Sequence, residues 1–302
     1  MDNLSYAQKQ RLAYIDFRLM FVGHFSRSEV VEHFKMGLSN ATRDINLYKE
    51  LAGSNLVYDN AEKRYFQTDS FKPLLDYDAQ KALMKLTHHL SDSLEALTDF
   101  KFPFEAPSQL SVPDIYTIAT LTQAAINQRA IKIDYISLES GESSREIMPH
   151  TIVDNGLRWH IRAYDTKSNE FRDFVITRIT NAKFSDTKVE SHQDKMADNQ
   201  WLRIVPLELV PHPSNIKYPK AIELDYNMSE GVLHLEVRAA VAGYLLRKLN
   251  VDCSSQASLE SPEHQLWLRN SPTLYGVDNL QLAAGYEHYT PQNITGNNHV
   301  RS

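Results

Sequence analysis

The chain has 302 residues, a hydrophobic fraction of 42% and a single cysteine, Cys253. This length predicts two domains or three small ones, and one cysteine excludes both an intramolecular disulfide and a zinc site built from cysteines, which fits a reducing cytoplasm. The net charge of -6 argues against a protein that coats DNA over its whole surface, but a local DNA-reading face is compatible with it. The first residues are polar and charged, and no apolar run of about 18 residues occurs, so neither a signal peptide nor a membrane span is expected.

The N-terminal part shows the pattern of three short helices. Apolar side chains at helical spacing over residues 5–21 predict a first helix. Ser26 and Glu29 have the spacing of a capping box, which predicts the start of a second helix. The glycine-containing stretch 35–38 predicts a tight turn, after which Ser39 is expected to cap a third helix. Two short helices joined by such a turn are the plan of a helix-turn-helix.

The third predicted helix has an apolar side, expected to face a core, and a polar side suited to DNA. Arginine reads guanine and asparagine reads adenine in the major groove. Asp44 and Glu50 are expected to dilute the positive charge, and a plain three-helix bundle with a polar surface is the alternative interpretation. The residues of this helix that we expect at DNA are Ser39, Asn40, Thr42, Arg43, Asn46 and Lys49.

A β-hairpin is predicted directly after the third helix. Residues 56–58 and 64–66 are strand-like and flank a turn. A winged helix carries its wing at this place, and Lys63 and Arg64 on the hairpin could contact the phosphate backbone. Three helices and a hairpin over residues 1–72 therefore predict a winged helix-turn-helix DNA-binding domain.

Residues 73–112 are predicted to form a helical linker. A narrow apolar stripe runs along residues 73–97 and could pair across a dimer or dock on the neighbouring domain. His88 and His89 are adjacent on this helix and point in different directions, so we interpret them as surface residues and expect no metal site. A proline-containing loop then leads to the next domain.

The central part of the chain, residues 113–190, is predicted to hold one helix followed by about five strands. Asp114 is expected to cap the helix, and turn residues separate the strand-like runs. Pro149 is expected at a strand edge or a bulge, because proline cannot donate to a sheet ladder. One helix with a meander of strands suggests a small, strongly bent sheet or a barrel.

An arginine-rich stretch, residues 145–179, lies at the middle of this part. Side chains alternate between residues 157 and 165 as in a half-buried strand. Arginine forks bind phosphate or carboxylate in bidentate fashion, so the polar side of this strand is a candidate anion pocket, and nucleotides are the obvious anions. That side holds Arg158, His160, Arg162 and Tyr164. The alternative is a solvated sheet face with ordinary ion pairs, whose carboxylates would be Glu146, Asp165 and Asp173.

The string GLRWHIRAYD resembles the signature of WYL-domain proteins, although Trp159-His160-Ile161 departs from the Trp-Tyr-Leu tripeptide at two of its three letters. With Pro149-His150 upstream and FRDF and Arg178-Ile179 downstream, the chain is most similar to BrxR/CapW-type repressors, bacterial regulators associated with phage-defence gene clusters. The resemblance covers nearly the whole chain. It implies an α+β architecture that joins a winged helix-turn-helix, a WYL domain with an Sm-like β-barrel and a C-terminal dimerisation domain.

The resemblance also implies ligand-contacting residues in the WYL domain. Trp159 shares the parity of Ile161 and Ala163, which favours a core position, and His150 could serve either the cation cluster or a structural hydrogen bond. No cofactor is expected, and the effector would be an anion such as a nucleotide or a nucleic-acid fragment. The effector-binding candidates are Tyr135, Ser137, Arg145, His150, Trp159, Arg162, Tyr164, Arg172 and Arg178.

The C-terminal part begins after a polar stretch. We interpret residues 183–200 as a linker that leads out of the WYL domain. Residues 201–288 mix strand-like runs with a short helix and resemble the α/β extension that contributes to dimerisation in the family.

These patterns together predict a homodimeric, sequence-specific transcriptional repressor of the cytoplasm. It would bind an inverted repeat of double-stranded DNA, regulate a phage-defence operon and change its DNA affinity when the WYL domain binds an anionic effector. An accessory protein whose WYL domain grips single-stranded nucleic acid and modulates a defence effector is the main alternative. A small hydrolase that uses His150 and His160 is a second, but no known catalytic motif occurs, so we expect neither an enzyme nor a catalytic residue.

Overall fold

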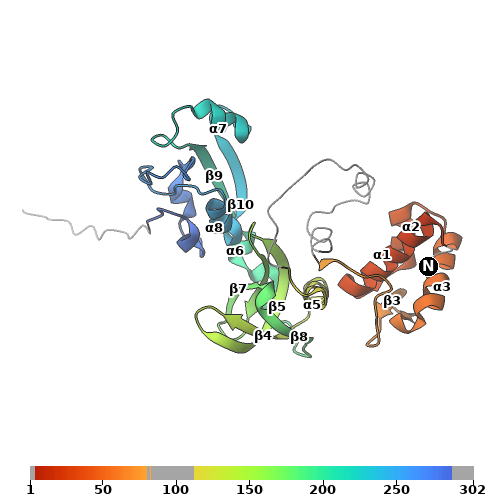
Figure 1. Cartoon of the computed structure of the whole chain (residues 1–302). Helices are drawn as coiled ribbons and strands as arrows, with labels where there is room; N and C mark the ends of the chain where they lie inside the picture. Colours follow the sequence, from red (N-terminus) through yellow and green to blue (C-terminus); the bar gives the residue numbers. More distant parts are fainter. Residues whose placement is uncertain (1–3, 80–81, 83–111, 288–302) are drawn as a thin grey trace, which may run out of the picture. The chain divides into compact units, whose positions relative to one another are not determined.

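The computed structural model describes residues 4–79, 82 and 112–287, shown in colour in Figure 1. The chain forms two compact units, Met1–Ala197 and Asp198–Ser302. Most of the predicted linking helix, with His88 and His89, lies outside the described residues.

The first unit begins with three helices, as the sequence predicts. Helix α1 spans Tyr6–Val22, α2 spans Arg27–Phe34 and α3 spans Leu38–Ala52. Ser26 and Glu29 form the expected capping box of α2. The prediction that Ser39 caps α3 is wrong. Gly37 has the extended backbone of an N-cap (φ -73°, ψ 149°), and its carbonyl already accepts from the amides of Asn40 and Ala41.

The predicted hairpin follows α3 after a short 3-10 turn, Gly53–Asn55. Strands β2 (Leu56–Asp59) and β3 (Arg64–Gln67) pair antiparallel, as a wing would. A strand of two residues, β1 (His24–Phe25), adds to the other edge of β3. The sequence did not reveal β1, because two residues are too few to show a strand period.

A buried carboxylate ties α1 to α3 and to the chain that leaves the wing. Asp16 is fully buried and accepts from the backbone amides of Leu74 (3.0 Å) and Leu75 (3.3 Å). The hydroxyls of Tyr48 and Tyr77 donate to the same carboxylate. Burial first, and the Asp16 carboxylate in addition, raise the pKa of both tyrosines, so both stay protonated as donors.

Helix α5 (Ile115–Ile126) opens the rest of the first unit, and Asp114 caps it as predicted, since its carboxylate accepts from the Thr117 amide. Five strands then form one antiparallel sheet in the order β7-β6-β5-β4-β8. Their bounds are β4 Ile131–Ser137, β5 Gly141–Asp154, β6 Trp159–Asp165, β7 Glu170–Val175 and β8 Ile179–Phe184, with a 3-10 turn at Ile176–Arg178 before β8.

Two irregularities bend this central sheet. The register of β5 against β6 shifts between Pro149 and Thr151, where a bulge was expected, and that of β4 against β8 shifts between Asp134 and Tyr135. Among the described strands, β7 and β8 are edges with one neighbour each. The predicted succession of one helix and five strands is therefore confirmed, and the closure of the sheet into an Sm-like barrel stays a prediction.

The second unit is a smaller mixed α/β fold. Its sheet has the order β10-β9-β11 and is antiparallel throughout. Helix α8 packs on one side of this sheet through a shared apolar core, in which Ala242 and Leu246 join Leu207 and Leu209. Its bounds are α6 Asn199–Leu202, β9 Ile204–Pro211, α7 Pro219–Asp225, β10 Leu233–Arg238, α8 Ala239–Lys248, β11 Leu266–Leu268 and the 3-10 turns Ser271–Leu274 and Leu280–Leu282.

A buried His212–Asp252 pair organises the loops of the second unit. His212 Nδ1 accepts from the amides of Ser214 and Asn215, so Nε2 carries the proton and donates to Asp252 (3.2 Å). Asp252 also accepts from the Leu259 amide, and this hydrogen bonding lowers its pKa although burial acts to raise it. In the described part of the chain, no helix is long and apolar enough to cross a membrane.

Asp16→Asn should destabilise the winged helix-turn-helix. An amide has one acceptor oxygen for groups that now share two, and its NH2 would face donors, so we expect the free energy of unfolding to fall by about 3 kcal/mol. Urea unfolding of the full chain measures this change. Asp69→Asn, at an exposed position of the same domain, is the matched control. Equal stability of the two variants would show that the Asp16 carboxylate is dispensable.

Candidate DNA interface and effector site

The predicted DNA-reading residues of α3 lie on its solvent side. Ser39, Asn40, Arg43, Asn46 and Lys49 are exposed, and Ala41, Ile45 and Tyr48 on the opposite side are buried. Thr42 is half-buried, and its hydroxyl donates to the Leu38 carbonyl (2.9 Å), which reduces its freedom to reach a base. The helix therefore has the polar outer row and apolar inner row expected of a recognition helix.

Asp44 does not dilute the charge of this face, contrary to the prediction. Its side chain is only 3% exposed and forms an ion pair with Arg11 of α1 at 2.5 Å. A buried carboxylate needs a cationic partner, and Arg11 of α1 is that partner. The residue pattern of α3 alone cannot show this pairing, because Arg11 lies on another helix. The exposed charged residues from Ser39 to Glu50 are therefore Arg43, Lys49 and Glu50.

The two cations of the wing differ in freedom. Lys63 is exposed at the turn, where its backbone is left-handed (φ 54°). Arg64 is half-buried, and its guanidinium lies 2.7 Å from His24 Nδ1 and 3.8 Å from Glu29 Oε1. A guanidinium only donates, so Nδ1 accepts; burial first, and then Arg64, lower the pKa of His24. Lys63 is consequently the freer of the two for a phosphate contact.

Two amide side chains join the end of α1 to α5. Gln123 Nε2 donates to the Met20 carbonyl (2.6 Å) and to Gln67 Oε1 of β3 (3.0 Å). Asn127 Nδ2 donates to the Val22 carbonyl (2.8 Å). These carbonyls are at the C-terminal end of α1, where backbone acceptors lack helical partners. Met20 and Phe21 also belong to the apolar core that α5 shares with the central sheet. The winged helix-turn-helix and the central sheet are thus packed together through α5.

The effector candidates do not converge on one patch, because strand β6 divides them between two faces. All seven residues of β6 are buried, so both faces of this strand are covered. Trp159 and Ile161 lie in the apolar core with α5, and Arg162 and Tyr164 point to the other side. The prediction of a half-buried strand with one solvated face is wrong for this reason.

On the core face, the candidates have structural partners. Arg145 Nη1 lies 2.5 Å from Asp165 Oδ2, and the side chains of these two residues are 10% and 0% exposed. Tyr135 is buried against Phe174, and its hydroxyl accepts from the Val175 amide at 3.4 Å. Trp159 is 4% exposed, so its predicted core position is confirmed. These residues support the sheet from within.

On the other face, Arg162 is 5% exposed and pairs with Asp173 at 3.1 Å. Tyr164 packs edge-on against Phe171 and His192, and its hydroxyl donates to Asn169 (3.4 Å). Two of the three carboxylates that the alternative interpretation named, Asp165 and Asp173, therefore do neutralise arginines.

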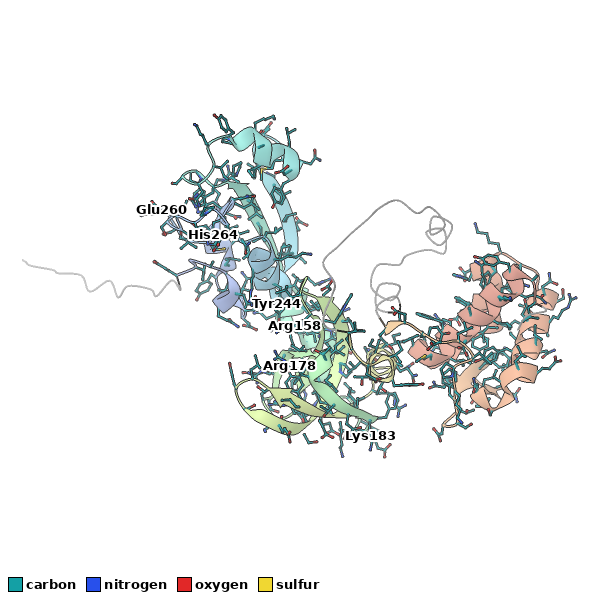
Figure 2. All side chains as sticks on the ribbon, in the orientation of Figure 1. Arg158, Arg178, Lys183, Tyr244, Glu260 and His264 are labelled. Carbon is teal, nitrogen blue, oxygen red and sulfur yellow. The ribbon has the colours of Figure 1, made fainter. Side chains whose placement is uncertain are left out.

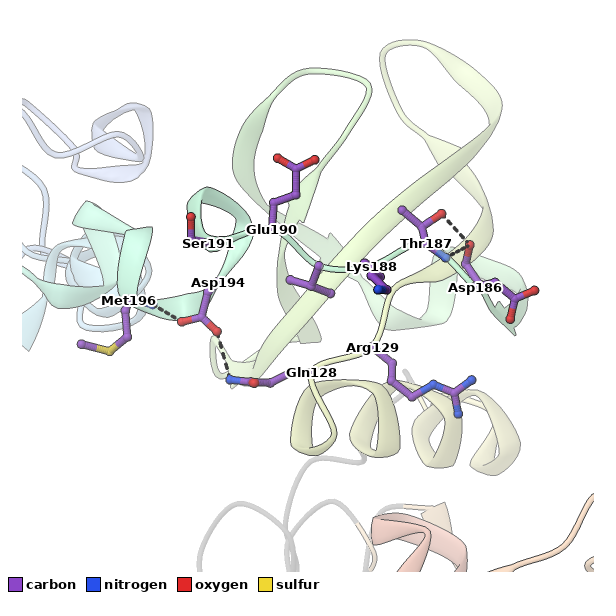
Figure 3. A pocket seen from close by; sticks show the side chains of 11 residues that line it. Gln128, Arg129, Asp186, Thr187, Lys188, Glu190, Ser191, Asp194 and Met196 are labelled. Atoms are coloured by element: carbon purple, nitrogen blue, oxygen red, sulfur yellow. Dashed lines mark hydrogen bonds between the residues drawn. The ribbon is translucent and has the colours of Figure 1, made fainter.

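The segment interpreted as a linker folds back over this face. Val189 packs against Met148 and Tyr164, and the hydroxyls of Ser185 and Thr187 donate to Glu146 (2.5 and 2.8 Å). A hollow of about 760 Å³ lies between this segment and Gln128 and Arg129, which connect α5 to β4 (Figure 3). Its lining mixes both charges, with Arg129 and Lys188 against Asp186, Glu190 and Asp194, so it favours no single class of ligand.

Two arginines remain available beside β6. Arg158 and Arg178 are labelled in Figure 2, and both act electrostatically on the buried His160. Within the described residues, neither guanidinium forms an ion pair or a hydrogen bond. The sequence places Arg158 on the polar side of the strand but does not identify it as an effector contact, because the pattern does not show that Arg145 and Arg162 are neutralised.

His160 is neutral in this setting. Its Nδ1 lies 3.1 Å from the Arg158 carbonyl, which only accepts, so the proton is on Nδ1. Burial is the largest cause that lowers its pKa from 6.5, and Arg158 and Arg178 lower it further, whereas Asp173 acts in the opposite direction.

The other candidates are placed as follows. Ser137 accepts from the amides of Glu139 and Ser140 in a turn. His150 Nδ1 lies 2.9 Å from Thr151 Oγ1, and its ring meets Phe171 edge-on. Arg172 is exposed, 3.9 Å from Glu170. In the part of the chain that the structure describes, no group of three or more His, Cys, Asp or Glu could hold a metal ion.

Comparison with known protein families assigns all three parts. The BrxR transcriptional regulator winged helix-turn-helix domain matches residues 7–89, the WYL domain matches 116–184, and the BrxR transcriptional regulator C-terminal dimerization domain matches 204–274. The fold and these matches define a transcriptional regulator that carries a winged helix-turn-helix and a WYL domain.

Relatives along nearly the whole chain make the assignment specific. Proteins named DNA-binding transcriptional repressor CapW are 30% identical in Escherichia coli (strain KTE188), over 90% of this chain and 92% of that protein, and 32% identical in Pseudomonas aeruginosa, over 88% and 90%. The relative of the same name in Stenotrophomonas maltophilia is 30% identical over 87% and 90%. The chain belongs to this BrxR/CapW family of transcriptional regulators. The family is regulatory, so the chain is not an enzyme and the hydrolase alternative is set aside.

His160 should make the stability of the protein depend on pH. Its pKa is below 6.5 in the folded state, so as the pH falls through 6.5 the unfolded chain binds the proton first and the folded state is disfavoured. We expect His160→Gln to flatten part of the loss of stability between about pH 7.5 and about pH 5.5. The lowered pKa of His24 acts in the same direction and would remain.

Thermal unfolding at these two pH values measures the effect. His192→Gln, at a histidine whose side chain is 56% exposed, is the matched control and should change the pH dependence less. If His160→Gln and wild type lose stability equally on acidification, His160 is not protonated preferentially in the unfolded state.

Proposed function

We propose that the protein is a homodimeric, sequence-specific DNA-binding repressor whose WYL domain binds an anionic effector that changes DNA affinity. The observation that carries the DNA part is α3, the second helix of a helix-turn-helix, whose solvent side presents Asn40, Arg43 and Asn46. The names of the relatives and the dimerization domain support repression and a dimer. A dimer with two such helices would read the halves of an inverted repeat.

The effector part rests on Arg158 and Arg178. Arg145 and Arg162 are neutralised by Asp165 and Asp173, whereas Arg158 and Arg178 have no such carboxylate among the described residues and could receive a phosphate or carboxylate. A nucleotide or a short nucleic-acid fragment is the class of anion that we propose.

The route from effector to DNA would run through α5. Gln123 and Asn127 hold the last carbonyls of α1, and α5 packs on the sheet that carries the cations. A ligand shifts an equilibrium only by the difference of its affinities for the two states, and a tenfold change of DNA affinity needs about 1.4 kcal/mol. By resemblance to repressors of phage-defence gene clusters, we propose such an operon as the regulated one.

Arg43→Ala should weaken binding to duplex DNA from the region upstream of the protein's own gene. Loss of one bidentate base contact costs about 1–3 kcal/mol, which is roughly five- to 150-fold in Kd. A gel-shift titration with scrambled duplex as competitor measures it, and Arg247→Ala, exposed on α8, is the control. Unchanged affinity would place recognition elsewhere, and wild-type binding without selectivity would favour the accessory single-strand binder.

Arg158→Ala with Arg178→Ala should abolish effector binding and keep DNA binding. The probes are nucleoside mono- and diphosphates and short 5′-phosphorylated oligonucleotides, titrated calorimetrically into wild type and variant. Lys183→Ala, an exposed cation on β8, is the matched control (Figure 2). A probe that binds wild type and the double variant equally well would remove the assignment of these two arginines.

A further inference from the structure

Strand β10 of the second unit leaves one edge open. It pairs with β9 along its whole length, from Leu233 opposite Leu209 to Arg238 opposite Ile204, and in the described residues it has no second strand neighbour. An edge strand offers every second backbone N–H and C=O to a further strand. The strand is six residues long and without proline, so nothing in its own sequence blocks such pairing.

The apolar side of this edge is incompletely covered. On β9, Val205, Leu207 and Leu209 are at most 1% exposed beneath α8. The β10 residues on the same side belong to the same core but are only partly buried; they are Leu233, Leu235 and Val237. Apolar side chains thus become more exposed from β9 to the open edge of β10, and a further strand at this edge would bury them.

The polar side of the strand is self-complementary. His234 and Glu236 are both exposed and point away from α8. An imidazole N–H can donate to a carboxylate, so a second copy of this strand could satisfy both residues at once. The match of a strand with itself points to a second copy of the chain as the occupant.

We propose that β10 pairs antiparallel with β10 of a second copy about a two-fold axis at Leu235, so that the two sheets join into one. This rests on the proposed homodimer and identifies its surface. Leu235 lies opposite the partner's Leu235, Leu233 opposite the partner's Val237, and His234 opposite the partner's Glu236. Directly opposed side chains share a face, so apolar residues meet on the α8 side and His–Glu pairs form on the other.

Symmetry selects this register. Two antiparallel neighbours related by a two-fold axis have that axis normal to the sheet and midway between the strands, so one residue lies directly opposite its own copy. An axis at His234 would place two histidines opposite each other, and an axis at Glu236 would place two carboxylates opposite each other. An axis at Leu233 or Val237 would pair only the ends of the two strands. Arg238 donates to the Trp201 carbonyl (2.6 Å) and lies over the Trp201 ring. It is therefore not free to stabilise an alternative register in which the strands are shifted toward Val237.

A cysteine scan on the full chain tests the register. Opposed Cα atoms in an antiparallel pair are about 4.5–5.5 Å apart, which is within the range that a disulfide spans. Leu235→Cys should therefore give a disulfide-linked dimer on mild oxidation, whereas His234→Cys and Glu236→Cys should not. The native Cys253 is 1% exposed and serves as the wild-type background.

A charge exchange at exposed positions tests the surface without touching the core. With His234→Glu, each copy places the new carboxylate opposite Glu236 of the other copy, so two repulsive pairs form. The dimer dissociation constant measured by sedimentation should rise about tenfold. Adding Glu236→Lys to that variant should restore the wild-type value. Gln256→Glu, exposed outside β10, is the matched control and should have no effect.

The outcomes separate the two proposals. A wild-type chain that sediments as a monomer would overturn the homodimer and this surface together. A wild-type dimer in which Leu235→Cys does not cross-link and His234→Glu has no effect would keep the homodimer and overturn the β10 surface. Cross-linking through His234 or Glu236 instead would overturn the register.

Discussion

The burial of β6 on both faces determines which arginines of the WYL domain are available to a ligand. A buried guanidinium needs a carboxylate, because the cost of removing its charge from water is not recovered otherwise. Arg145 and Arg162 accordingly have Asp165 and Asp173 within ion-pair distance, one pair on each face of the sheet. What looks in the sequence like one cluster of cations is therefore two structural pairs, an exposed Arg172 that lies 3.9 Å from Glu170, and the remaining Arg158 and Arg178.

The same strand packs against the helix that joins the central sheet to the winged helix-turn-helix. Its core face packs on α5, and α5 holds the end of α1 through the amides of Gln123 and Asn127. On the far side of α1, the Asp16 carboxylate binds Tyr48 of the recognition helix and the chain after the wing. Helix α1 thus contacts α3 through one face and contacts α5 of the WYL domain through its C-terminal end. A continuous path of packed and hydrogen-bonded residues therefore runs from the central sheet through α5 and α1 to α3.

Local patterns in the sequence were sufficient for the elements. Capping by Ser26 and Asp114, the hairpin of the wing, the bulge at Pro149 and the succession of five strands are set by interactions within a few residues, and each is confirmed. Where the prediction failed locally, at Ser39, the competing signal was the extended backbone of Gly37 two residues earlier. The two-residue strand β1 was missed because it exists only through its pairing with β3.

The site required contacts between residues far apart in the chain. Arg11 and Asp44 are separated along the sequence but paired in space, and so are Arg145 and Asp165, so charge counted along one element misjudged both surfaces. Val189 also packs against Tyr164, a contact that the polar sequence around Val189 does not predict. The sequence by itself determined the helices and strands of the first unit apart from β1, the order of the domains and the family; in the second unit it predicted a strand where helix α7 forms. Only the tertiary structure decided which cations are neutralised and which edge stays open, because ion pairing and burial depend on neighbours that periodicity within one element cannot specify.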